Sequence, residues 1–170
     1  MKNHQLFIYF ICLVSAMGGL LFGYDWVVIG GAKPFYEEYF HIAGDEGMQA
    51  LAMSIALLGC LLGVTMAGFL ADRYGRKKLL VLSAFIFFAS SWATGAATTI
   101  PTFIIARLVG GMAIGLAADL SPMYIAEVAP TQIRGKLVTL NQLTIVLGIL
   151  GAQIVNMLIA EPVPEGATAA

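Results

Sequence analysis

An acid and a base stand inside runs of this sequence that are otherwise almost entirely apolar. Asp25 lies in the stretch LLFGYDWVV, and Arg107 lies near the start of the run 102–121. A bare charge in apolar surroundings is unfavourable unless a partner neutralises it or, for the acid, a proton does. Desolvation favours the neutral acid whereas a nearby guanidinium favours the carboxylate, so such a pair could bind and release a proton. The alternative interpretation is a fixed structural ion pair.

The two charges are expected at the same depth of a membrane. Asp25 lies about seven residues before the outer end of its helix, which is ~10 Å at the helical rise of ~1.5 Å per residue. Arg107 lies about six residues beyond Pro101 on a helix that runs the other way, which is ~9 Å. Each charge alone would cost about 2.5–3.5 kcal/mol on insertion scales. We therefore predict that the two side chains pair.

A second group of charges lies in two short connections. The stretch GFLADRYGRKKLL holds Asp72 and a run of basic residues around Gly75, which suits a tight reversal between antiparallel helices. The stretch SPMYIAEVAPTQIRGK places Glu127 before Arg134. We predict a charge network that closes the inner face, whereas simple anchoring to anionic lipid headgroups is the alternative. Its expected members are Asp72, Arg73, Gly75, Arg76, Lys77, Glu127 and Arg134.

A polar stripe follows one face of the last apolar run. Gln142, Gln153 and Asn156 share this face with Ile149 at 100° per residue. Polar groups in a span ordinarily face the bundle interior or a watery path. Hydrogen bonding between helices is the competing explanation.

The elements that must position these groups are membrane-spanning helices. Hydrophobic residues make up 59% of the chain and charged residues 11%, with a mean hydropathy of +0.87, against roughly 25% charged residues in soluble domains. Spanning a bilayer takes about 20 residues of helix. The sequence predicts one helical bundle over 1–160 and a tail or loop outside the membrane over 161–170. Its helices are expected at 6–32, 48–70, 79–100, 102–121 and 137–160, with all six prolines at or beyond their ends.

The distribution of basic residues predicts the orientation. Lys and Arg gather before the first run, between the second and third, and between the fourth and fifth, whereas the other connections are mainly acidic. Because basic loops stay in the cytoplasm, the amino terminus is expected inside and the carboxyl end outside. A secretory signal peptide is an alternative for the first run, but that run is longer than the ~7–15 apolar residues of a signal core. The odd number of spans suggests an incomplete bundle.

Several chemistries have no support in the sequence. No G-x-x-x-x-G-K-[ST] motif for ATP occurs. His4 and His41 lack neighbours at a metal-ligand spacing, and no serine has a nucleophile-elbow context. The composition excludes nucleic-acid binding in practice. We therefore expect no cofactor, no metal and no enzymatic activity.

The motifs together resemble the sugar porters of the major facilitator superfamily. They are LLFGYD at 20–25, G-x-x-x-D-R-x-G-R-K at 68–77, R-L-V-G-G at 107–111, P-M-Y-I-A-E-V-A-P at 122–130, R-G-K at 134–136 and N-Q at 141–142. The likeness is greatest to bacterial proton-coupled sugar symporters of the D-xylose type. It implies an all-α bundle of the major facilitator type, with five transmembrane helices of an amino-terminal six-helix half.

The resemblance also implies roles for single residues. Asp25 matches the proton-coupling carboxylate and Arg107 its partner. Phe22 matches an aromatic that packs on the sugar, and Gln142 a glutamine that binds its hydroxyls. At Ile149 some symporters carry another glutamine, so part of the sugar contact differs here. Asp119 stands where relatives have an apolar residue, and Lys77 where arginine is common.

The function implied is proton-coupled symport of a hexose or pentose by alternating access. The expected partners are the sugar, the proton, the lipid bilayer and the carboxyl-terminal half of the same carrier. The expected location is a bacterial inner membrane. A facilitative sugar uniporter and a non-transporting sugar sensor on the same fold remain alternatives.

Overall fold

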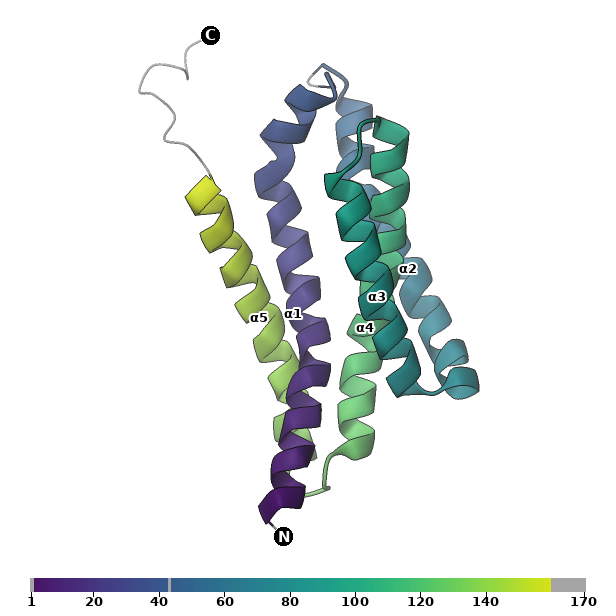
Figure 1. Cartoon of the computed structure of the whole chain (residues 1–170), viewed down its shortest axis with the longest axis vertical. Helices are drawn as coiled ribbons and strands as arrows, with labels where there is room; N and C mark the ends of the chain where they lie inside the picture. Colours follow the sequence, from purple (N-terminus) through teal and green to yellow (C-terminus); the bar gives the residue numbers. More distant parts are fainter. Residues whose placement is uncertain (1, 43, 160–170) are drawn as a thin grey trace.

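The computed structural model describes residues 2–42 and 44–159, and this part of the chain folds into five α-helices (Figure 1). In chain order they are α1 (Lys2–Tyr39), α2 (Glu46–Tyr74), α3 (Arg76–Gly95), α4 (Ile100–Val128) and α5 (Arg134–Ile159). Each contains a segment long and apolar enough to cross a membrane. The prediction of an all-α chain with five spans is confirmed. The expected tail at 161–170 lies outside the described residues.

Most of the helices are longer than the apolar runs from which they were predicted. The first helix continues to Tyr39 and the fourth to Val128, whereas α3 ends at Gly95, before the expected end at 100. As a result Pro34 and Pro122 lie inside α1 and α4, and the expectation that every proline lies at or beyond a helix end is wrong for these two. Hydropathy detects the part of a helix inside the bilayer, but a helix continues until a backbone signal stops it.

Two parallel helix pairs form the frame of the bundle. Helix α1 packs mainly on α5, and α2 packs mainly on α4 (Figure 1). Helix α3 lies against α4, and α1 and α4 cross between the two pairs. The contact between α1 and α4 is the one that matters for the site, because it joins the helices that carry the buried acid and the buried base.

Glycine allows both pairs to approach backbone to backbone. A Cβ at Gly111 would collide with the carbonyl oxygen of Ala56 on α2, and one at Gly63 would collide with that of Met112 on α4. On the other pair, a Cβ at Gly148 would collide with the carbonyl oxygen of Leu20. Small residues at such crossings are typical of helices that pack tightly in membranes.

The connections divide the bundle into two ends of opposite charge. We call the basic end the one that holds the α2–α3 turn and the α4–α5 connection, with Arg76, Lys77 and Arg134. The acidic end holds the α1–α2 connection, with Glu37 and Asp45. Asp45 caps α2 by accepting a hydrogen bond from the Met48 amide at 3.1 Å, and this bond fixes where the helix begins.

Candidate functional site

The predicted acid and base lie together between α1 and α4. Nη1 of Arg107 donates to Oδ1 of Asp25 at 2.8 Å and to Oδ2 at 3.0 Å. The side chain of Arg107 is 6% exposed and that of Asp25 is 13% exposed. Both charges are therefore largely buried. In a buried place the strength of an ion pair depends on its geometry, because little water is present to screen the charges.

The helices position this pair by running in opposite directions. From the acidic end, α4 begins at Ile100 and reaches Arg107 after two turns, whereas α1 passes Asp25 on its way to that end. The turn before Arg107 packs Phe103 into a cluster with Tyr36 and Ile29 of α1. This cluster holds the two helices in the register that lets the side chains meet.

Phe22 shares a small pocket with Asp25. The pocket has a volume of about 20 Å³ and is bounded by α1, α2 and α4, with Cys60 and Gly111 on its far walls. This volume is enough for about one water molecule. Of the three residues predicted to contact sugar, Phe22 is the one that lies beside the ion pair.

The other two predicted sugar-binding residues lie on α5, away from that pocket. Gln142 is exposed and Ile149 is half-buried. Within the described part of the chain, Gln142 and Gln153 make no hydrogen bond. Asn156 on the same stripe donates to the Val27 carbonyl of α1 at 3.1 Å. The polar stripe thus divides, since Asn156 bonds a neighbouring helix whereas Gln142 and Gln153 are exposed.

A buried polar layer between α1, α4 and α5 was missed by the sequence analysis. The Ser121 hydroxyl donates to the Ser15 carbonyl, with Oδ1 of Asn141 3.0 Å away as a second acceptor. The Thr144 hydroxyl donates to the Ala16 carbonyl at 2.6 Å. These side chains tie three helices together at one level. The available signal was a set of small polar residues inside apolar runs, but spacing alone does not show that they face one another.

At the basic end the structure brings together three of the predicted network residues. Nε of Arg76 lies 2.9 Å from Oε1 of Glu127, and Nη2 lies 3.1 Å from Oδ1 of Asp72. Arg76 also donates to the Ala71 carbonyl at 3.3 Å. Gly75 adopts φ +84° between α2 and α3, a conformation that favours glycine. Arg76 is therefore the residue that links the α2–α3 turn to α4.

The remaining network candidates stay outside this contact. Arg73 lies over the ring of its neighbour Tyr74, 5.6 Å from the centroid. Lys77 and Arg134 are exposed. Among the described residues neither Arg73, Lys77 nor Arg134 forms an ion pair, and the same holds for the half-buried Asp119. Their predicted roles in gating stay predictions.

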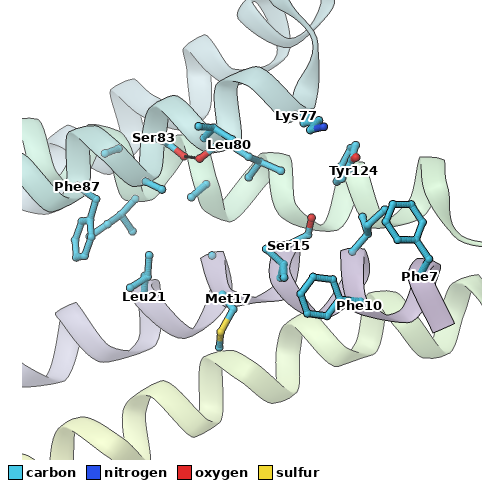
Figure 2. A pocket seen from close by; sticks show the side chains of 18 residues that line it. Phe7, Phe10, Ser15, Met17, Leu21, Lys77, Leu80, Ser83, Phe87 and Tyr124 are labelled. Carbon is cyan, nitrogen blue, oxygen red and sulfur yellow. Dashed lines mark hydrogen bonds between the residues drawn. The ribbon is translucent and has the colours of Figure 1, made fainter.

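A larger groove opens between α1 and α3 over α4 (Figure 2). Its volume is about 550 Å³, and its walls are apolar apart from a few groups such as Ser83, Tyr124 and Lys77. A sugar needs many hydrogen-bond partners and this lining offers few. The groove is therefore a poor sugar site, although it is far larger than the pocket beside Asp25. Its chemistry suits an apolar helix or lipid.

Comparison with known proteins shows the relationship of this chain. The family described as "Sugar (and other) transporter" matches residues 11–165. The arabinose-proton symporter of Bacillus subtilis is 38% identical over 157 residues, which cover 92% of this chain and 33% of that protein. The D-xylose-proton symporter of Escherichia coli K12 is 39% identical over 184 residues, covering 94% and 37%. The glucose transport protein of Synechocystis is 44% identical over 154 residues, covering 91% and 32%.

Solved structures agree with this result. The xylose transporter XylE from E. coli in an inward open conformation matches with a TM-score of 0.82 and 36% identity, covering 92% of this chain and 41% of that one. XylE bound to 6-bromo-6-deoxy-D-glucose matches with a TM-score of 0.84, also at 36% identity, covering 91% and 38%. The chain spans about a third of the length of the curated relatives it matches. The predicted major facilitator fold is confirmed, as is the prediction that the chain belongs to a family of transporters and not of enzymes. This chain is an integral membrane protein that belongs to the sugar porter family of the major facilitator superfamily.

Proposed function

We propose that this chain is the amino-terminal part of a carrier that moves a monosaccharide together with a proton. The observation that carries this proposal is the buried contact of Asp25 with Arg107, 2.8 Å apart, beside a pocket lined by Phe22. When an acid in this place takes a proton, it loses the charge attraction that holds Arg107. Occupancy by a proton and the arrangement of α1 against α4 are therefore linked.

The relatives support the class of substrate. The relatives described above are an arabinose-proton symporter, a glucose transport protein and a D-xylose-proton symporter. This range is consistent with a hexose or a pentose as the cargo. Phe22 would pack on the sugar ring, and Gln142 would bind its hydroxyls from α5. Ile149 offers only an apolar contact, so the remaining hydrogen bonds would come from the other part of the carrier.

The apolar groove supports the proposal that more protein covers this bundle. Side chains of α1, α3 and α4 surround it (Figure 2), and a lining so apolar suits a further helix. The partners of this chain would then be the rest of the carrier, the lipid bilayer, the sugar and the proton. Transport would require the complete carrier.

In the proposed cycle the proton acts first. With the site open outward, Asp25 takes a proton and loses the charge that holds Arg107. The sugar then binds across Phe22 and Gln142. The ion pairs of Arg76 with Glu127 and Asp72 then break at the inner face. As the two halves of the carrier rock, Arg73, Lys77 and Arg134 meet new partners. The site then opens inward.

The distribution of charge supports the orientation within this proposal. Every arginine and lysine at the basic end would face the cytoplasm, together with the amino terminus. Asp25 then lies in the outer half of the membrane, where a proton arriving from outside reaches it first. The membrane would be the inner membrane of a bacterium, in keeping with the bacterial relatives.

The test is an isosteric change of the acid in the full-length carrier. In Asp25→Asn we expect proton-driven accumulation of sugar to be lost, whereas exchange of labelled for unlabelled sugar continues, because the site keeps its shape but no longer titrates. Asp45→Asn, at an exposed position where Asn still caps α2, is the matched control and should accumulate sugar normally. Unchanged uphill uptake in Asp25→Asn would defeat the proton role. Sugar entry without alkalinisation of the medium would indicate a uniporter, and sugar binding without exchange would indicate a sensor.

A further inference from the structure

Four buried side-chain atoms without a hydrogen bond lie in the acidic half of α1 and α4. They are Nε and Nη2 of Arg107, the Tyr36 hydroxyl and Oε1 of Glu37, and of these four atoms Oε1 of Glu37 has an ion-pair partner, Lys33 at 3.4 Å. Arg107 is 6% exposed and Tyr36 is 7% exposed, so bulk water does not reach these atoms directly. Arg107 binds Asp25 through Nη1 alone. The other edge of its guanidinium, formed by Nε and Nη2, therefore carries two donor atoms that make no hydrogen bond.

The fold places Tyr36 beyond the ion pair, where α1 packs on the start of α4. It lies eleven residues after Asp25, which is about three turns further along nearly the same face of α1. Its ring packs on Phe103, 5.4 Å between centroids, and Phe103 stands one turn before Arg107 on α4. Ile29 of α1, one turn beyond Asp25, belongs to the same buried cluster as Tyr36 and Phe103. The phenol is therefore the polar group between the buried ion pair and the acidic end.

The chemistry of these groups suits bound water. A buried polar atom left without a partner is costly, and a water molecule held by two to four such atoms removes that cost. The free edge of Arg107 donates, the Tyr36 hydroxyl can both donate and accept, and the Glu37 carboxylate accepts. Waters bridging them would form a continuous hydrogen-bonded path.

We propose that Glu37 and Tyr36 form the route by which protons from the outer side reach Asp25. This inference rests on the proposed symport function. Glu37 takes a proton at the acidic end, and the proton is handed along: each water or hydroxyl accepts one proton as it passes another on, until Asp25 is neutral. Tyr36 ends the step unchanged, and Arg107 stays charged throughout because a guanidinium does not deprotonate in proteins.

The other charged groups near this route are few. Lys33 lies 3.4 Å from Oε1 of Glu37 on the same helix and holds it at the acidic end. Arg107 is the charged group that α4 contributes. Helix α2 contributes Glu46, next to its Asp45 cap, and the charged side chains of α3 and α5 all lie at the basic end.

The chain offers adjacent residues of the same type as matched controls. Tyr36→Phe removes only the buried hydroxyl, and Tyr39→Phe makes the same change at a side chain that is 61% exposed. Glu37→Gln and Glu38→Gln form a second such pair, since Glu38 is exposed. The four variants of the full-length carrier are reconstituted into vesicles. Sugar-driven proton uptake and sugar counterflow are measured in each.

We expect Tyr36→Phe and Glu37→Gln to slow proton uptake at least about fivefold, the effect of one lost hydrogen bond in the path, while counterflow changes less than about twofold. The two control variants should match the unmodified carrier in both assays. Equal proton uptake in Tyr36→Phe and Tyr39→Phe would overturn the route and leave symport standing. A parallel loss of counterflow would also overturn it, because that result indicates a packing role. Absence of proton uptake in the unmodified carrier would refute symport itself, and the route with it.

Discussion

Two of the ion pairs that join different helices have nearly the same distance and different surroundings. Arg107 lies 2.8 Å from Asp25, and Arg76 lies 2.9 Å from Glu127. The first pair is 6% and 13% exposed, whereas the second is 29% and 47% exposed. The two ion pairs therefore differ in their access to water and not in the distance between the charged atoms.

This difference predicts different roles for the two contacts. Removing one member of a buried pair strands the other charge in a medium that cannot solvate it, which costs about 3–5 kcal/mol. An exposed pair contributes only ~0–1 kcal/mol because water replaces either partner. The buried pair is suited to couple a proton to helix arrangement. The exposed pair is suited to open and close many times at little cost.

The largest effect is expected from breaking the buried pair. Arg107→Met in the full-length carrier should lower the free energy of unfolding by about 3–5 kcal/mol, because Asp25 is left unpaired. The double change Asp25→Leu with Arg107→Met should recover most of this loss while sugar-driven proton uptake stays absent. Thermal unfolding in detergent measures the first quantity and vesicle assays the second. A double variant no more stable than the single one would show that the loss came from packing and not from a stranded charge.

An intermediate effect is expected at the turn that supports the exposed contact. Gly75→Ala should lower the free energy of unfolding by about 1–3 kcal/mol, because a side chain is strained at φ +84°. Gly68→Ala is the control, since Gly68 is exposed, lies within α2 and has nothing near its Cβ position. That control should be neutral or slightly stabilising in the same unfolding measurement. Equal behaviour of the two variants would argue against a backbone requirement at the turn.

The smallest effect is expected at the exposed contact itself. Glu127→Gln should change stability by at most about 1 kcal/mol, and the difference should shrink as salt is added. Arg134→Gln, which removes a charge at the same end without breaking an ion pair among the described residues, should change stability by less than about 0.5 kcal/mol. Melting at low and high salt checks both. A loss at Glu127 as large as that at Arg107 would erase the distinction between the two contacts.

Much of the site could be predicted because charge in a membrane is rare. Asp25 and Arg107 could be paired from depth alone, since few other charges lie in these spans. Gly75 stood in a short connection where a reversal was required. By contrast, nothing in the sequence distinguished Arg76 from Arg73 as the partner of Glu127. The two arginines lie on either side of the turn at Gly75, and the conformation of that turn decides which of the two side chains points toward Glu127.

Other features depend on which faces meet. Ser121, Asn141 and Thr144 are ordinary polar residues along the chain, and they become a layer only when α1, α4 and α5 converge. Asn156 was grouped with Gln142 by periodicity, yet the packing of α5 on α1 gives it a backbone partner. Periodicity places residues on one face of a helix but does not say how far along that face the neighbouring helix follows.

By itself the amino-acid sequence determined that this chain crosses a membrane five times, that its basic connections share one end, and that one acid and one base must meet in the apolar region. These conclusions follow from the free energy of placing charge and peptide groups in hydrocarbon, which depends on residue type and spacing. Only the tertiary structure decided which atoms of Arg107 are used, that Tyr36 and Glu37 stand beyond it toward the acidic end, and that the large groove is apolar. Those outcomes depend on the register and contact of helices distant in the chain, which local spacing does not encode.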